Sequence, residues 1–146
     1  MTTYDPNNPF ARILRGELPS TNVHEDTATL AFMDLMPQAE GHTLVIPKTP
    51  AVELMELDSK SATALMLSVQ AVARAVKTAF SAPGVIIAQL NGPAAGQTVF
   101  HVHFHVVPAW PGTTLSVHGG KQAERSDLER TAAKIRAVFE PPTSTG

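Results

Sequence analysis

The sequence predicts an α+β domain with a mostly antiparallel sheet, and three observations carry this prediction. Residues 21–25 and 29–33 read as two strands around a polar turn, the pattern of a β-hairpin. Apolar residues recur at helical spacing over about 59–80 and again over about 126–140. The resulting order of hairpin, strand, helix, two strands and helix is typical of an α+β domain.

The elements before the long helix are short. Residues 10–15 predict a helical turn, because Gly16 follows and glycine commonly lies just beyond a helix end. A third strand is expected over 43–46 and ends at Pro47. The hairpin and this strand together supply the first three strands of the sheet.

The long helix shows the clearest periodicity. Either Asp58 or Ser59 can cap its N-terminus, and Gly84 breaks the pattern after it. Its apolar face is predicted to comprise Leu65, Val69, Val72, Val76 and Phe80.

The second half of the chain predicts two more strands and a helix. Residues 85–90 form a nearly continuous apolar run that suits a central strand, and 91–96 is a loop with two glycines. A further strand is expected over about 98–107. Ser126 is expected to cap the last helix, with Glu129 completing a capping box.

Length and composition narrow the class of protein. The 146 residues suit one domain over 1–146, and a net charge of −2 argues against a nucleic-acid partner. No apolar stretch approaches the roughly 18 residues that span a membrane, and the N-terminus lacks a secretory pattern. We therefore expect a cytoplasmic protein with no membrane partner. The absence of cysteine leaves neither a disulfide framework nor a thiolate zinc site.

Three of the six histidines fall at alternate positions of one segment, as His101, His103 and His105. Successive side chains of a strand point to opposite faces, so we expect these three rings to share one face. Imidazoles need hydrogen-bond partners when they are buried, which makes such a row an unusual packing solution. The row therefore predicts a functional site.

Three interpretations of this row compete. The first is a structural histidine cluster. The second is a metal site, with a fourth ligand from His42 or Asp34. The third is nucleophilic catalysis, in which one imidazole attacks and its neighbours tune it.

The residues around the row favour catalysis. The glycine-containing loop at 91–96 is expected to offer N–H groups to an anionic oxygen, with Gln97 and Thr98 as side-chain donors. A metal site would call for carboxylates nearby, and none occurs between Asp58 and Glu124.

Four motifs in order give the chain a more specific resemblance. The first is Phe10-x-x-Ile13-Leu14-Arg15-Gly16-Glu17-Leu18-Pro19, followed by Leu30-Ala31-Phe32-Met33-Asp34-Leu35-Met36-Pro37, Gly41-His42-Thr43-Leu44-Val45-Ile46-Pro47-Lys48 and Asn91-Gly92…Gly96-Gln97-Thr98-Val99-Phe100-His101-Val102-His103-Phe104-His105-Val106-Val107-Pro108. Over about 9–108 the chain resembles the histidine triad (HIT) superfamily, and within it the Hint and bacterial HIT-like hydrolase branch.

This resemblance implies a HIT-like fold and nucleotidyl hydrolysis or transfer through a covalent intermediate on the middle histidine, His103. Its imidazole would attack the α-phosphorus of a purine nucleoside phosphoramidate, or of another AMP or GMP conjugate, and water would release the nucleotide. No cofactor is implied. His101, His105 and His42 would orient His103 or bond a phosphate oxygen.

The resemblance also assigns substrate-binding residues. Gln97, Thr98 and Asn91 would hold the phosphate or the leaving group, and Asp34 would accept hydrogen bonds from the ribose hydroxyls. The wall of the base pocket would consist of Phe10, Ile13, Phe32, Leu35 and Leu44.

Some positions depart from the family pattern. Many relatives bind a structural zinc with a Cys-x-x-Cys pair, whose places here are Asn8 and Ala11, so we expect no metal. Relatives that transfer uridylyl groups end the triad in glutamine, so His105 argues for hydrolysis. Ala109 stands where dinucleoside polyphosphate hydrolases often have a basic residue.

Two alternatives to a phosphoramidate hydrolase remain from the sequence. One is a dinucleoside polyphosphate hydrolase, and the other is a nucleotide-binding regulatory protein whose catalysis is incidental. The resemblance further implies a homodimer, formed through the long helix and the strand after it.

Overall fold

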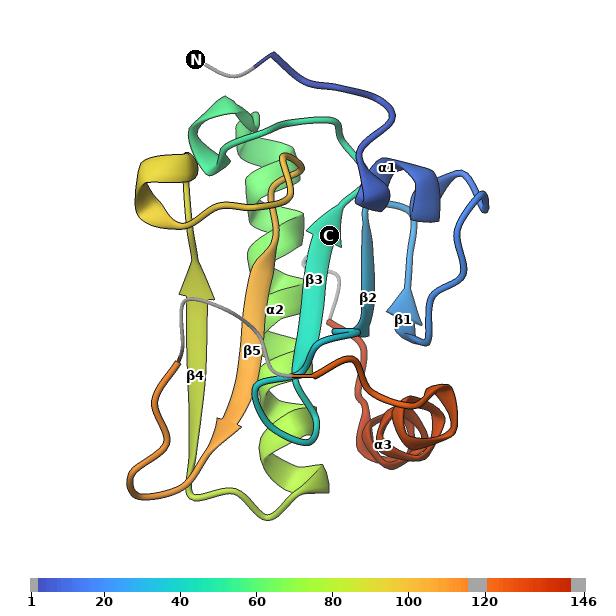
Figure 1. The fold of residues 1–146 in the computed structure, drawn as a ribbon, viewed down its shortest axis with the longest axis vertical. Coiled ribbons are helices and arrows are strands. Elements are labelled where there is room, and N and C mark those ends of the chain that lie inside the picture. Colours follow the sequence, from blue (N-terminus) through green and yellow to red (C-terminus); the bar gives the residue numbers. More distant parts are fainter. Residues whose placement is uncertain (1–2, 116–120, 143–146) are drawn as a thin grey trace.

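A computed structural model describes residues 3–115 and 121–142 of the chain. Its centre is one antiparallel sheet of five strands in the order β1-β2-β3-β5-β4 (Figure 1). This sheet and its helices confirm the predicted α+β class. The strands are β1 (Asn22–Glu25), β2 (Thr29–Met33), β3 (Thr43–Pro47), β4 (Gly84–Gln89) and β5 (Phe104–Ala109).

Helices cover the two faces of the sheet unequally. The long helix α2 (Ser59–Ala79) packs on β2 to β5, and α3 (Arg125–Val138) packs beside it on β1 and β2. The short helix α1 (Pro9–Leu14) lies on the opposite face (Figure 1). Two single turns of 3-10 helix, η1 (Leu54–Glu56) and η2 (Pro93–Ala95), lie in the loops before α2 and after β4.

The side chains of β2 and β3 divide between two apolar clusters. The larger cluster joins the sheet to α2 and α3, and Val45 and Phe104 belong to it. The smaller cluster lies under α1 and contains Phe10, Phe32 and Leu44. Because strand side chains alternate, the residues between those of the larger cluster face α1, and His105 is one of them.

The long helix forms as its sequence predicts. Asp58 is its N-cap, and the Asp58 carboxylate accepts a hydrogen bond of 2.7 Å from the N–H of Ser61. Four of the predicted apolar positions, Leu65, Val69, Val72 and Val76, are buried against the sheet. Full burial of one such side chain contributes about 1.5–3 kcal/mol, so this face anchors the helix on the sheet.

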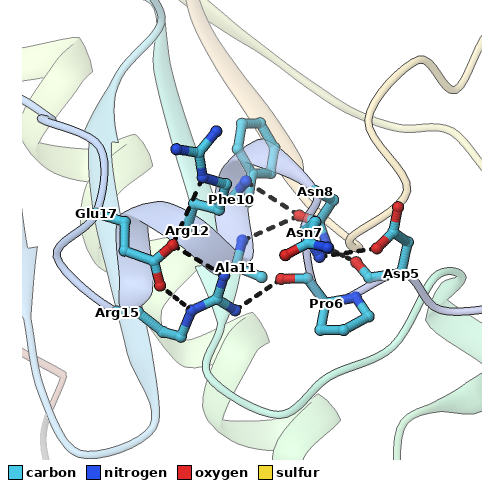
Figure 2. Close-up of polar contacts among 9 residues, drawn as sticks. All are labelled: Asp5, Pro6, Asn7, Asn8, Phe10, Ala11, Arg12, Arg15 and Glu17. Carbon is cyan, nitrogen blue, oxygen red and sulfur yellow. Dashed lines mark hydrogen bonds and ion pairs between the residues drawn. The ribbon is translucent and has the colours of Figure 1, made fainter.

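A capped turn fixes α1 on the other face. The Asn8 side-chain oxygen accepts hydrogen bonds from the N–H groups of Phe10 and Ala11, which caps the helix (Figure 2). The Arg15 guanidinium binds the carbonyl of Pro6 at 2.6 Å and also contacts the Glu17 carboxylate. These contacts hold the Phe10 ring against the sheet.

The connection between β2 and β3 passes close to the end of α2. Gly41 has a backbone φ of +96° there, and a side chain on it would collide with the ring of Phe80. Glycine is therefore required for this loop to close onto the helix. The closed loop delivers His42 to the start of β3.

Three predicted boundaries are wrong. The histidine strand was expected from about residue 98, yet β5 begins at Phe104, so His101 and His103 precede the strand. The expected cap of the last helix at Ser126 is also wrong, because the N-cap is Glu124 and makes no side-chain capping bond. This helix ends at Val138 rather than near residue 140.

No helix within the described ranges 3–115 and 121–142 is long and apolar enough to cross a membrane.

Candidate active site

A cavity of about 1110 Å³ opens on the face of the sheet that carries α1. Three histidines line it, namely His42, His103 and His105, together with Asp34 and Thr98. All five residues predicted to wall a base pocket also line this cavity: Phe10, Ile13, Phe32, Leu35 and Leu44. The lining of the cavity thus combines apolar side chains with imidazoles, and the Phe10 ring lies against the His103 ring.

His103 has a defined proton arrangement. Its Nδ1 lies 2.7 Å from the carbonyl oxygen of His101, and a carbonyl can only accept, so Nδ1 carries the proton. The lone pair of the neutral ring is then on Nε2. The edge of the ring also meets the Phe10 ring, with centroids 5.0 Å apart, which restricts its rotation. His103 therefore presents an unprotonated nitrogen while lining the cavity.

His42 and His105 form a directed pair. The N–H of Gln38 donates to His42 Nδ1 at 3.1 Å, so the proton of His42 is on Nε2. His42 Nε2 lies 3.0 Å from His105 Nδ1 and donates to it. The proton of His105 is consequently on its own Nε2. Of these two cavity-lining rings, His103 therefore has an unprotonated Nε2 and His105 has an N–H donor at Nε2.

His101 lies behind the cavity rather than in its wall. Its side chain is fully buried, with Nε2 2.8 Å from the carbonyl oxygen of Pro47 and Nδ1 2.7 Å from the hydroxyl of Tyr4. The expected row of three rings is thus reduced to His103 and His105 at the cavity, with centroids 5.0 Å apart. His101 acts through its backbone carbonyl, which binds His103.

Asp34 is the cavity-lining carboxylate that lies beside the histidines. It follows β2, and one of its oxygens accepts the N–H of Met36 at 2.8 Å. The other oxygen lies 3.4 Å from His42 Nε2. His105 Nδ1 is closer to His42 Nε2, at 3.0 Å. Because burial lowers the pKa of His42 to about 4, His42 is neutral at pH 7 and the contact with Asp34 is no ion pair.

Burial sets the charge of the whole cluster. Desolvation lowers the pKa of His105 to about 4, and it also lowers the pKa values of His101 and His103. Desolvation raises the pKa of Asp34. Each histidine therefore remains neutral at pH 7, the state in which an imidazole can attack phosphorus.

The loop at 91–96 differs from its predicted role. Several of its N–H groups bond within the loop, as when Gly92 donates to the side-chain oxygen of Gln97 at 2.7 Å. Gln97 is buried and also donates to the carbonyls of Val52 and Val99. Gln97 is not among the described residues that line the cavity. Gln97 thus shapes the loop from behind.

Asn91 has a similar structural position. Its side-chain oxygen accepts the N–H of Leu54 at 2.8 Å, and its amide is paired with the side chain of Gln89. Thr98, by contrast, is exposed and lines the cavity as predicted. Of the three residues expected to hold the phosphate or leaving group, only Thr98 is among the described residues that line the cavity.

Asp34, His42 and His105 place one candidate ligand atom each within 4.8 Å of one another, which is the geometry of a metal cluster. Their proton arrangement does not fit a metal. His42 Nδ1 is occupied by the Gln38 N–H, so Nε2 is protonated and cannot coordinate. Hydrogen bonds, rather than coordination to a metal ion, satisfy the polar atoms of these three residues.

Sequence reasoning missed two contributors to the site. Tyr4 contacts His101 across 97 positions of the chain, and no local pattern signals such a contact. The segment before α3 also reaches the cavity, where the N–H of Ala123 bonds the carbonyl of Leu35 at 2.9 Å and Arg125 lines the wall. The capping signal at Ser126 indicated a helix start nearby but not its place beside the cavity.

The low pKa values predict a specific pH response. The ring resonances of His42 and His105 should keep their positions from pH 8 down to about 5, because burial holds both pKa values near 4. The unfolded chain takes up protons first, near pH 6.5, so stability should fall as pH drops from 6.5 towards 4. The loss is at most about 1.4 kcal/mol per pH unit for each ring.

Nuclear magnetic resonance titration of the folded protein, with thermal unfolding at the same pH values, measures both effects. The raised pKa of Asp34 acts in the opposite sense and reduces the net loss. Midpoints near pH 6.5 for both rings would contradict the buried neutral cluster.

Comparison with known proteins now identifies the family. The family model for the HIT domain matches residues 15–111. A Hit-like protein from Bartonella henselae, described as involved in cell-cycle regulation and solved with an unknown ligand, is 44% identical with a TM-score of 0.87 over 93% of this chain and 98% of that one.

Two further solved structures are similar. A hypothetical histidine triad nucleotide-binding protein from Sulfolobus tokodaii is 33% identical, with a TM-score of 0.80 over 88% of this chain and 89% of that one. A zinc-bound histidine triad family protein from Mycobacterium smegmatis is 36% identical, with a TM-score of 0.78 over 90% and 91%. The family model, which covers most of the chain, and these close structural matches show that the chain belongs to the HIT family.

Proposed function

We propose that this protein hydrolyses purine nucleoside phosphoramidates or related nucleotide conjugates through a nucleotidyl intermediate on His103. The HIT family is a superfamily of nucleotide-binding proteins and hydrolases, which sets the class of chemistry. One observation carries the finer proposal. The bond from His103 Nδ1 to the His101 carbonyl leaves the Nε2 lone pair free in a cavity that is wide enough for a nucleotide.

The reaction proceeds in two displacements. His103 Nε2 forms a bond to the α-phosphorus as the bond from phosphorus to the leaving group breaks, and the leaving amine takes up a proton from solvent. Water then attacks the phosphorus, releases the mononucleotide and restores the free imidazole. His103 is cationic while it carries the nucleotide, so its Nδ1–H bond to the carbonyl becomes charge-assisted and stronger.

His105 and His42 serve the phosphoryl group. The His105 Nε2–H donates to a phosphoryl oxygen, where negative charge develops as phosphorus is attacked. His42 fixes this donor by holding the other nitrogen of His105 as an acceptor. Thr98, which follows the loop at 91–96, adds a hydroxyl donor. Gln97 and Asn91 support that loop through their own hydrogen bonds.

The nucleoside occupies the apolar part of the cavity. Asp34 accepts hydrogen bonds from the two ribose hydroxyls through Oδ2, the carboxylate oxygen that does not bond the Met36 N–H. The purine packs between side chains from α1, β2 and β3, with the aromatic rings of Phe10 and Phe32 held edge to face, 5.4 Å between centroids. The lining is Phe10, Ile13, Phe32, Leu35 and Leu44.

The chemistry in this proposal uses no metal. The two positions where many relatives carry a zinc-binding Cys-x-x-Cys pair offer no ligand set here, because Asn8 caps α1 with its side chain and Ala11 has no donor. The cluster of Asp34, His42 and His105 is unsuited for the reason given above. Turnover is therefore expected to persist after exhaustive chelation.

Replacement of the nucleophile is the most direct test of this function. His103→Ala should lower kcat by several orders of magnitude while AMP binding largely survives, since binding rests on other groups. Assays of both proteins in a chelator should use adenosine phosphoramidates, aminoacyl adenylates and dinucleoside polyphosphates. Mass spectrometry of quenched turnover should find the nucleotide on His103.

An adduct on His101 or His105, with His103 unmodified, would overturn the assignment. Wild-type binding of AMP without turnover of any substrate in the panel would instead indicate a nucleotide-binding regulatory protein.

The ribose contact is tested at Asp34. Asp34→Asn keeps an oxygen for the Met36 N–H but removes the charged acceptor. Charge-assisted hydrogen bonds contribute about 1.5–3 kcal/mol, so nucleotide affinity should fall about 10- to 100-fold. The exposed Asp127→Asn is the matched control. Calorimetry with ribo- and dideoxyribonucleotides measures what the two hydroxyls contribute together, and equal wild-type affinity for both sugars would remove the ribose role.

We also propose a homodimer through α2 and β4. β4 is an edge strand of the sheet; Ile87 is exposed on it, and the exposed Leu90 and Trp110 lie beside its two ends. Light scattering should give twice the chain mass of 15.5 kDa. Ile87→Lys should yield monomers because an unpaired charge disfavours strand pairing, whereas Val138→Lys, exposed on α3, should not. A monomeric wild type would contradict this assembly.

A further inference from the structure

We propose that Tyr4 is a positioning residue for the reaction: its hydroxyl fixes the ring of His101, and through His101 it holds His103 in the tautomer that attacks. This inference rests on the proposed function of His103. Its basis is a chain of three contacts that begins outside the cavity, in the segment before α1.

The first contact fixes the protons of His101. The carbonyl of Pro47 accepts from Nε2 at 2.8 Å, so Nε2 carries the only proton of the neutral ring. Nδ1 is then an acceptor, and the Tyr4 hydroxyl donates to it at 2.7 Å. Because the ring is fully buried, Nδ1 would have no solvent partner without Tyr4.

The second contact joins His101 to the nucleophile. The peptide between His101 and Val102 is held from both sides, because its carbonyl accepts from His103 Nδ1 at 2.7 Å and its N–H donates to Ala51 at 2.9 Å. Movement of His101 therefore displaces the acceptor that fixes His103. The Phe10 ring contacts both imidazoles, with centroids 6.5 Å from His101 and 5.0 Å from His103.

The third set of contacts places Tyr4 itself. The carbonyl of Asp5 accepts from the side-chain amide of Asn8 at 2.8 Å and from its backbone N–H at 3.1 Å. Asn8 is also the N-cap of α1, as Figure 2 shows. The turn that caps α1 therefore also sets the position of the adjoining Tyr4, and the half-buried phenol reaches inward to His101.

Tyr4 also controls charge. A hydroxyl that donates to Nδ1 favours the neutral form of His101, because a protonated nitrogen could not accept. Protonated His101 would place a cation beside His103, whose own ring becomes cationic in the intermediate. The titratable groups of the described chain that face His101 are Tyr4 and His103, while α1 contributes the Phe10 ring and β3 the Pro47 carbonyl.

The experiment compares Tyr4→Phe, which retains the ring and removes the hydroxyl, with Thr3→Ala on the exposed neighbouring residue. Tyr4→Phe should lower kcat about tenfold near pH 7, the effect of losing one buried hydrogen bond, with KM changed less than about twofold. The acid limb of its kcat profile should move towards neutral pH, because His101 protonates more readily. Thr3→Ala should match wild type throughout.

A nitrogen-15 spectrum of the imidazoles supplies a readout that needs no turnover. Tyr4→Phe should change the signals of both His101 and His103 in the full-length folded protein. Unchanged signals, or a kcat loss of equal size at every pH, would overturn the positioning role. If wild type turns over no substrate in the panel, the proposed hydrolase fails, and the spectra alone still decide whether Tyr4 sets the two rings.

Discussion

The hydrogen bond between His103 Nδ1 and the carbonyl of His101, 2.7 Å long, is the contact on which the site depends. A neutral imidazole has one proton, and this bond places it on Nδ1. The lone pair of the neutral ring is thereby on Nε2, the nitrogen that would attack phosphorus in the proposed reaction. The acceptor is a backbone carbonyl whose peptide is anchored by the bond from the Val102 N–H to the Ala51 carbonyl. A backbone carbonyl does not titrate, so this acceptor is present at every pH.

The order of strands brings the other groups to this nitrogen. β3 lies between β2 and β5, and Leu44 is the register partner of His105. His42 and Asp34 lie just outside the paired ends of β3 and β2, where the Asp34 N–H donates to the His42 carbonyl at 3.0 Å. The antiparallel sheet thus brings together His42 and His105, which are 63 positions apart in the chain. Because both rings are buried there, both remain neutral.

The sequence predicted the elements that local chemistry decides. The Asp58 cap and the apolar stripe gave α2, and alternation placed His103 and His105 together at the cavity. Tertiary contacts decided the rest. β5 begins at Phe104, which pairs with Gln89 of β4 and Val45 of β3, and the residues before it leave the sheet. His101 therefore meets Tyr4, a contact that no spacing in the sequence reveals.

Neutron crystallography of the free protein tests the central claim most directly, because it locates the protons on the rings. We expect deuterium on Nδ1 of His103 and on Nε2 of His42, His101 and His105, with none on Nε2 of His103. Deuterium on Nε2 of His103, or on Nδ1 of His42, would contradict the proton arrangement from which the nucleophile and its donor are assigned.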